Sequence, residues 1–228
     1  RNCGASDVII SGDLSESDIW AEDLNEILSQ LRASPAYVGG QSAGQRVSLL
    51  LAILHPESVR GLLLWNITGG SIAAEQLGYN YYDQFIDIAE KTGMQGIVES
   101  DFFAERIRQN PSNLERLKSM ETQDFINVMR IWRSFFTDDT PVIGATEAQL
   151  RAIKVPIVII PGTENDPIHP RSVGENLHKI LQNAELHPPI WSPEEYATLR
   201  LEDPNAFQEL GHDRRAPIFL DFLASIPE

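Results

Sequence analysis

The sequence predicts an α/β protein, in which a parallel sheet is flanked by helices and interrupted by a helical insertion. Continuous apolar runs such as 155–160 indicate strands that are buried on both faces, as a parallel sheet covered by helices requires. Helical patterns separate these runs, and residues 67–150 carry helical patterns but no buried-strand pattern. We therefore expect a partial sheet with only four strands, near 36–40, 61–66, 155–160 and 184–190.

An amphipathic helix is expected before the first strand. Its side chains Trp20, Leu24, Ile27, Leu28 and Leu31 recur at helical spacing, so they are predicted to form one buried face. Ser17 or Asp18 can cap the start of this helix, where acidic side chains also suit the helix dipole.

The segment after the first strand reads Gly-Gln-Ser-Ala-Gly over residues 40–44 and continues into a helix-length apolar run that Pro56 stops. Gly40 and Gly44 flank Ser42 at two places where a Cβ is expected to collide with the neighbouring strand or helix. A strand, a tight turn carrying a serine and a helix together form the context of a nucleophile elbow. The pattern therefore predicts that Ser42 is an activated nucleophile.

With these motifs, the chain resembles the α/β-hydrolase family over nearly its whole length. Residues 4–7, Gly-Ala-Ser-Asp, look like the loop after the fourth strand of that family, and His55-Pro56 looks like the end of its elbow helix. The resemblance implies a catalytic domain made of residues 1–66 and 151–228, with residues 67–150 as a helical cap. It also implies that no cofactor takes part in the reaction.

One feature of the family is missing from this sequence. The family has several strands and a His-Gly loop before this point, and that loop donates half of the oxyanion hole. We expect that a missing N-terminal segment or a second chain, as in a homo-oligomer, completes the sheet, because a central strand with an open apolar edge aggregates or finds a partner. The chain by itself is expected to be incomplete and inactive.

The resemblance also suggests the acid of a catalytic triad. The family places an Asp in a Gly-containing loop with a Pro four residues later, and Asp166 with Pro170 matches this placement. Glu164 is the fallback, and the alternative is that Asp166 only caps the helix that starts near Pro170. Some family members keep the acid after the second strand found here, but that position is Asn66, which carries no charge.

Five histidines are candidates for the third member of the triad. His212 follows Gly211 before a final helix, and the order Ser42, Asp166, His212 is the order of the family. His187 in the last strand is the runner-up, and a site without a catalytic histidine stays open. His169 is expected to follow Asp166 too closely to act as its partner. His55 and His178 are assigned to a helix end and a surface helix.

Further residues are expected around this triad. The N–H of Ala43, at the start of the elbow helix, would be one oxyanion donor. Candidate pocket residues are Gln41, Trp65, Trp132 and Phe136, although cap aromatics more often pack the cap itself. One cysteine and scattered histidines give no zinc spacing, so no metal is expected, and no phosphate-binding loop is present.

These motifs favour a cofactor-independent serine hydrolase that acts on a small carboxylic ester, lactone or related acyl compound. Two alternatives stay open: a carbon–carbon bond hydrolase with the same triad, and a non-catalytic protein that binds a small ligand in this fold. An activated Ser42 distinguishes the enzymes from the binding protein.

Composition limits the partners of the protein. The formal net charge is −15, which disfavours nucleic acid and anionic membranes as partners. Cys3 is the only cysteine, so no intrachain disulfide can form and a cytoplasmic location is natural. No apolar run approaches the roughly 20 residues of a membrane span. A small-molecule substrate is therefore the expected partner.

Overall fold

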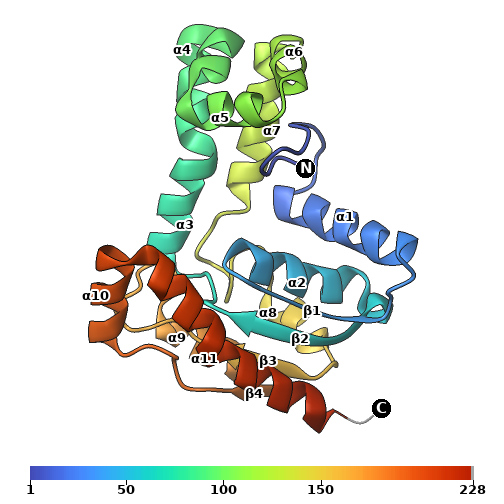
Figure 1. Cartoon of the computed structure of the whole chain (residues 1–228). Coiled ribbons are helices and arrows are strands. Elements are labelled where there is room, and N and C mark those ends of the chain that lie inside the picture. The colour runs from blue at the N-terminus through green and yellow to red at the C-terminus, as the bar shows by residue number, and fades with distance from the viewer. Residues whose placement is uncertain (227–228) are drawn as a thin grey trace. The chain divides into compact units, whose positions relative to one another are not determined.

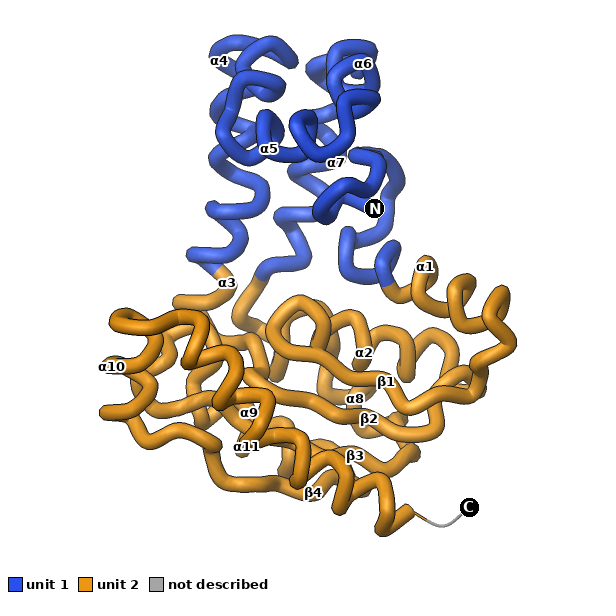
Figure 2. The backbone as a smooth tube through the Cα atoms, viewed as in Figure 1, with its two compact units in different colours: residues 1–20, 75–136 blue, residues 21–74, 137–228 orange. Residues whose placement is uncertain are grey.

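The computed structural model describes residues 1–226, which form two compact units (Figure 2). Unit 1 comprises Arg1–Trp20 and Glu75–Phe136, and unit 2 comprises Ala21–Ala74 and Thr137–Glu228. Unit 1 contains most of the predicted cap. Its limits differ from 67–150 at both ends, and it also includes the first twenty residues, which were expected in the catalytic domain.

Unit 2 contains one parallel sheet. Its strands, in spatial as well as chain order, are β1 (Ala36–Gln41), β2 (Val59–Trp65), β3 (Ile157–Ile160) and β4 (Ala184–Leu186). Each strand pairs in parallel with the next one. The prediction of an α/β fold with four strands is confirmed for the described residues. Because all strands run the same way, their carboxyl ends lie at one edge of the sheet.

Helices cover both faces of this sheet (Figure 1). The helices wholly within unit 2 are α2 (Ala43–Leu54), the short η1 (Pro56–Ser58), α8 (Glu147–Ala152), α9 (Arg171–Ile180), α10 (Pro193–Glu202) and α11 (Pro204–Ser225). Two further helices, α1 (Glu16–Gln30) and α3 (Ser71–Gly78), have residues in both units.

The two faces of β3 belong to different layers. Ile157 and Ile159 join the hydrophobic core that also contains buried side chains of α2, α8 and α9. Val158 and Ile160 point to the opposite face, because successive side chains of a strand alternate. That face is covered by α11 (Figure 1). All four side chains are at most 1% exposed, which explains why the run carries no polar alternation.

Only part of the predicted buried face of α1 is buried. Ala21 and Leu28 belong to the core, and Leu24 packs against it. Ile27 and Leu31 are 51% and 70% exposed, so the prediction was wrong for these two side chains. The buried stripe runs through positions 21, 24 and 28, and Leu31 lies beyond the last residue of the helix.

Unit 1 is built from helices around aromatic side chains. Beyond its parts of α1 and α3, its helices are the π-helical turn η2 (Tyr79–Asp83), α4 (Gln84–Glu99), α5 (Asp101–Gln109), α6 (Ser112–Lys118) and α7 (Thr122–Ser134). Phe85, Phe103 and Phe125 form a chain of ring contacts in its centre, with centroids 5.1–6.2 Å apart. The predicted helical insertion therefore has a core of its own.

Polar contacts fix the N-terminal segment to unit 1. The fully buried Asn113 accepts a hydrogen bond from the N–H of Val8 at 2.8 Å and donates one to the carbonyl of Ser6 at 3.2 Å. Arg116 pairs with Asp7 at 2.7 Å. These contacts join residues more than 100 positions apart, which is why the sequence pattern did not place the segment here.

Candidate active site

Ser42 lies in the tight turn between β1 and α2. Its φ of 52° and ψ of −114° are values that residues other than glycine rarely adopt. Such a conformation costs about 1–3 kcal/mol and persists only where the surroundings fix it. Here the N–H of Ser42 donates to the carbonyl of Asn66 at 3.1 Å. The predicted strand–turn–helix context of the serine is therefore present.

The two glycines around Ser42 play different parts. A Cβ at Gly40 would lie 2.5 Å from the carbonyl carbon of Gly44 and 2.7 Å from its Cα, so only glycine fits there. A Cβ at Gly44 would meet nothing within 4 Å, so the expected collision at this position was wrong. The turn does bring residues 40 and 44 close together, but only a Cβ on residue 40 would point into the contact.

Two polar side chains behind the elbow were not identified from the sequence. Thr68 is fully buried, and its hydroxyl donates to Ser42 Oγ at 3.4 Å, a long hydrogen bond. The N–H of Thr68 donates to Oε1 of the fully buried Gln45 at 3.3 Å. Thr68 belongs to no motif, and only the pairing of β2 beside β1 brings it to the serine.

Ala43 is the first residue of α2. The N–H groups of the first helical turn have no partner within the helix and carry the positive end of its dipole. The backbone of Ala43 thus has the properties of an oxyanion donor next to Ser42. Its role in catalysis stays a prediction.

Asp166 is the buried acid of the loop after β3, with an exposure of 1%. Its Oδ1 accepts from the N–H groups of Ile168 at 3.0 Å and His169 at 3.1 Å. Its Oδ2 accepts from Tyr196 Oη at 2.6 Å and contacts His169 Nδ1 at 2.9 Å. Burial alone would raise the pKa of this carboxyl, but the hydrogen bonds from His169 and Tyr196 outweigh burial and hold the pKa well below its usual range.

The alternatives for the acid have other surroundings. Glu164 is 68% exposed and lies 3.6 Å from Arg171, as a surface carboxylate does. The N-cap of α9 is Pro170, and the amides that Asp166 accepts from precede that residue. Asp166 therefore holds the loop together rather than capping the helix.

His169 is the histidine that contacts this acid, so the expectation that it lies too close in sequence to be a partner was wrong. The turn made by Ile168 and His169 over Oδ1 folds the chain back and brings the ring to Oδ2. Its other nitrogen, Nε2, is buried and has no hydrogen-bond partner among the described residues.

Tyr196 on α10 is the second residue that the sequence did not reveal. It is buried, and its pKa lies well above the usual range, first because of burial and then because it donates to the Asp166 carboxylate. Arg200 also contacts the Tyr196 hydroxyl. No local signal marks Tyr196, because α10 reaches the loop after β3 only in the folded chain.

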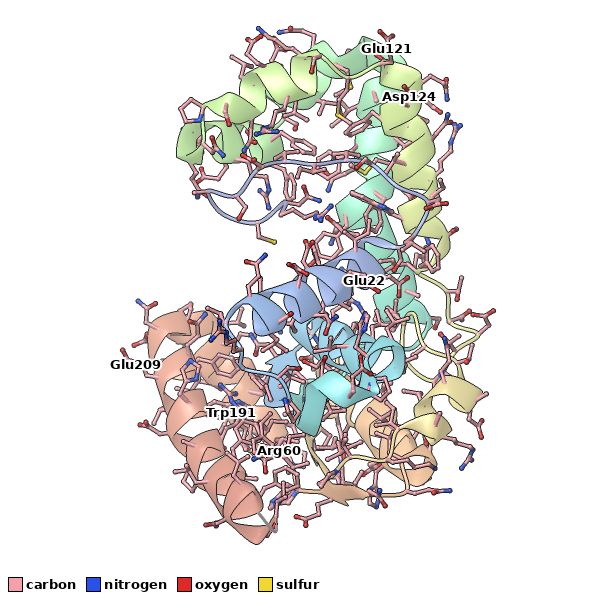
Figure 3. All side chains as sticks on the ribbon, turned by 90° about the vertical axis from the view of Figure 1, so that its right-hand side faces the viewer. Glu22, Arg60, Glu121, Asp124, Trp191 and Glu209 are labelled. Carbon is pink, nitrogen blue, oxygen red and sulfur yellow. The ribbon has the colours of Figure 1, made fainter. Side chains whose placement is uncertain are left out.

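The remaining histidines lie elsewhere. His212 is exposed on α11, and no hydrogen bond described in the structure joins it to Ser42 or Asp166. The backbone of His187 follows β4 and donates to Ile159. His55 bonds to Glu22 of α1, labelled in Figure 3, at 2.9 Å. The assignment of His212 as the base therefore stays a prediction without a hydrogen bond to support it.

Two of the predicted pocket residues lie together at the ends of β1 and β2. Trp65 Nε1 donates to Gln41 Oε1 at 3.0 Å, and Gln41 is exposed. On the α11 side, the Trp65 ring lies 5.4 Å from the ring of Phe219 and 5.5 Å from the guanidinium of Arg215. Burial lowers the pKa of Arg215.

The other two pocket candidates belong to unit 1. Trp132 and Phe136 are 2% and 5% exposed, and both rings contact Tyr82. They pack the interior of that unit, as cap aromatics commonly do. A role in a substrate pocket stays untested.

Trp191 anchors the C-terminal helices of unit 2. It stacks on Phe207 with centroids 4.8 Å apart and lies under the guanidinium of Arg214 at 4.5 Å. Figure 3 shows Trp191 beside the C-terminal helices, while Glu209 lies at their outer edge. This packing positions α10 and with it Tyr196.

Within residues 1–226, no group of three or more His, Cys, Asp or Glu side chains is placed to hold a metal ion. In the same range, no helix has the length and apolar character needed to cross a membrane.

No family model and no curated protein matches the chain. Solved structures do match at low sequence identity, and several of them are hydrolases or lactonases. Est816, an N-acyl homoserine lactone degrading enzyme, is 21% identical over 93% of this chain and 79% of its own, with a TM-score of 0.52. MGS-M2, an alpha/beta hydrolase enzyme from a Medee basin deep-sea metagenome library, is 23% identical over 94% and 76%, with a TM-score of 0.54. The enol-lactonase from Burkholderia xenovorans LB400 is 19% identical over 95% and 78%, with a TM-score of 0.52.

Proposed function

Since the chain has the α/β-hydrolase fold, we propose that it is a cofactor-independent serine hydrolase that acts on a small carboxylic ester, lactone or related acyl compound. Ser42 is the nucleophile, and Asp166 is the ionised acid that orients the base. Fold alone does not define chemistry, so the proposal depends on the residues of the site.

The observation that carries the proposal is the strained backbone of Ser42. A serine at φ 52° between a strand and a helix costs stability, and backbone strain of this kind clusters at functional sites. The same sheet edge carries Asp166, a buried carboxylate with four hydrogen bonds that keep it ionised. Acyl transfer by a serine needs a nucleophile, a base and a carboxylate that orients the base, and Ser42 and Asp166 are suited to the first and the last of these roles.

The reaction would follow the two steps of acyl transfer. Ser42 Oγ attacks the acyl carbon while a base takes its proton, and the leaving group departs with that proton. Water then attacks the acyl-enzyme and returns Ser42 to its starting state. The N–H of Ala43 would stabilise the negative charge on the acyl oxygen, because it lies at the positive end of α2.

Lactones are the first substrates to test. Est816 degrades N-acyl homoserine lactones, and the Burkholderia protein is an enol-lactonase. Both resemble this chain only at the level of fold, so they suggest the panel rather than the substrate. The panel should contain N-acyl homoserine lactones, simple γ-lactones and short-chain aryl esters.

The unpaired side of β1 suggests that the sheet needs a further strand. Within residues 1–226, β1 pairs with β2 on one side and with no strand on the other. We propose that a strand from a further segment of the protein, or from a second copy of the chain, pairs with β1, because an unpaired edge is a template for association. Size determination in solution, compared with the mass of 25.5 kDa, tests the second-copy form of this proposal.

The test of the function is labelling of Ser42 by a fluorophosphonate probe, compared with Ser42→Ala. We expect the natural protein to be labelled at Ser42 and Ser42→Ala to be unlabelled, with turnover of any ester or lactone reduced at least about 1,000-fold. The melting temperature of Ser42→Ala should be nearly unchanged, because one hydroxyl is lost. Retention of more than about one hundredth of the natural turnover by the variant would sink the assignment.

A further inference from the structure

The ring of His169 has one nitrogen that the fold satisfies and one that it does not. Nδ1 lies 2.9 Å from Asp166 Oδ2, whereas Nε2 is buried and lacks a partner among the described residues. Leaving a buried polar atom unpaired costs stability. A group that lacks a partner in the resting protein is a candidate for one that gains a partner during the reaction.

The contact to Asp166 defines which nitrogen can accept a proton. Since the carboxyl of Asp166 has a pKa well below its usual range, it is ionised and can only accept hydrogen bonds. Nδ1 must then carry the hydrogen, and in the neutral ring Nε2 carries the lone pair. This is the tautomer that a histidine needs in order to take a proton from a serine.

The Asp166 carboxylate has no acceptor site left for another histidine. An ionised carboxylate offers about four lone-pair sites. Two amide N–H groups, the Tyr196 hydroxyl and the His169 ring occupy them. His212 would have to displace one of these donors to reach Asp166, and it is exposed on α11.

The loop of His169 and the elbow both follow the carboxyl ends of strands, which lie on one side of the parallel sheet. Ser42 N–H donates to the Asn66 carbonyl, and Asn66 N–H donates to the Ile160 carbonyl, each at 3.1 Å, so the ends of β1, β2 and β3 are joined in a row. A Cβ on Gly162 would lie 1.9 Å from the carbonyl oxygen of His169, so His169 sits directly on the start of the loop after β3. Neighbouring strands are about 4.8 Å apart. The backbones of β1 and β3, which lead into the elbow and into this loop, are thus about 10 Å apart. A serine and a histidine side chain directed toward each other from these loops span such a distance through one hydrogen bond.

We infer that His169, and not His212, is the general base of Ser42. The inference rests on the proposed function. In the first step, Nε2 of His169 takes the proton of Ser42 Oγ as the bond from Oγ to the acyl carbon forms. The imidazolium then gives this proton to the leaving oxygen as its bond to the acyl carbon breaks. In the second step the ring takes a proton from water as the water oxygen bonds to the acyl carbon. It gives this proton to Ser42 Oγ as the bond from Oγ to the acyl carbon breaks, and Asp166 stays ionised throughout.

The experiment compares three variants of the full-length protein by their rates of fluorophosphonate labelling. His169→Asn keeps an N–H near the position of Nδ1 but has no base. His212→Asn is the matched control at the histidine that the motif order indicates as the base. Tyr196→Phe removes a different donor from Asp166 and leaves the base in place. Melting temperatures are measured for all of them.

We expect His169→Asn to lower the labelling rate at least about 100-fold, the lower end of what a general base contributes. Added imidazole should restore part of that rate. His212→Asn should label within about threefold of the natural protein, and Tyr196→Phe should lose far less than His169→Asn.

Three results would overturn the inference. The first is a normal labelling rate in His169→Asn, and the second is a loss confined to His212→Asn. The third is an equal loss in Tyr196→Phe and His169→Asn without rescue by imidazole, which would make His169 a support of the loop rather than the base. In all three the natural protein is still labelled, so the proposed function survives. Absence of labelling in the natural protein would overturn the function itself and this assignment with it.

Discussion

Replacing Gly40 by alanine should distort the elbow on which the proposed chemistry depends. The new Cβ would lie 2.5, 2.7 and 2.8 Å from the carbonyl carbon, Cα and oxygen of Gly44. All three are backbone atoms of the first turn of α2, so relief requires β1 and α2 to move apart. Overpacking of this kind costs about 1–3 kcal/mol, and the rigid backbone places Gly40→Ala at the upper end. At about 2–4 °C per kcal/mol for a chain of this size, the melting temperature should fall by roughly 6–12 °C.

Gly44→Ala is the matched control, because its Cβ would enter open space within a helix. Alanine is better than glycine in a helix by about 0.5–1 kcal/mol, so the melting temperature should stay constant or rise slightly. Thermal unfolding measures both stabilities, and fluorophosphonate labelling reports whether Ser42 keeps its position. Equal stability and equal labelling of Gly40→Ala and the natural protein would refute the steric reasoning.

Two further predictions concern buried polar groups. Because the folded pKa of Asp166 is depressed, its ionised form stabilises the protein above the unfolded pKa of about 3.9, and this contribution is lost as the pH falls through the lower folded pKa. Urea unfolding of Asp166→Asn should thus show a deficit at pH 7 that narrows below about pH 4, and a deficit that does not depend on pH would contradict the assignment. Asn113→Ala leaves the buried N–H of Val8 without its acceptor and should destabilise unit 1 by about 1–3 kcal/mol, whereas the exposed Asn127→Ala on α7 should change stability by less than about 0.5 kcal/mol. Similar urea midpoints for these two asparagine variants would show that the bond to Val8 is dispensable.

Local patterns in the sequence determined the elements of this protein. The continuous apolar runs predicted β2 and β3. Gly40 with Ser42 predicted the elbow, because the tight turn brings residue 40 against the backbone of residue 44, where only glycine fits. Burial of Asp166 also agrees with its predicted place in the loop after β3. For the strands and the elbow the physical cause lies within a few residues, so the sequence alone is sufficient for them.

The surroundings of the acid were decided only by tertiary structure. Tyr196 reaches Asp166 from α10, thirty residues later, and Thr68 reaches Ser42 because β2 pairs beside β1. The ring of His169 meets the carboxylate because the backbone folds back over Oδ1, which spacing along the chain does not reveal. The order of the motifs along the chain indicated His212 as the base. The donors that occupy the four acceptor sites of the Asp166 carboxylate can be identified only when the positions of all donors in space are known.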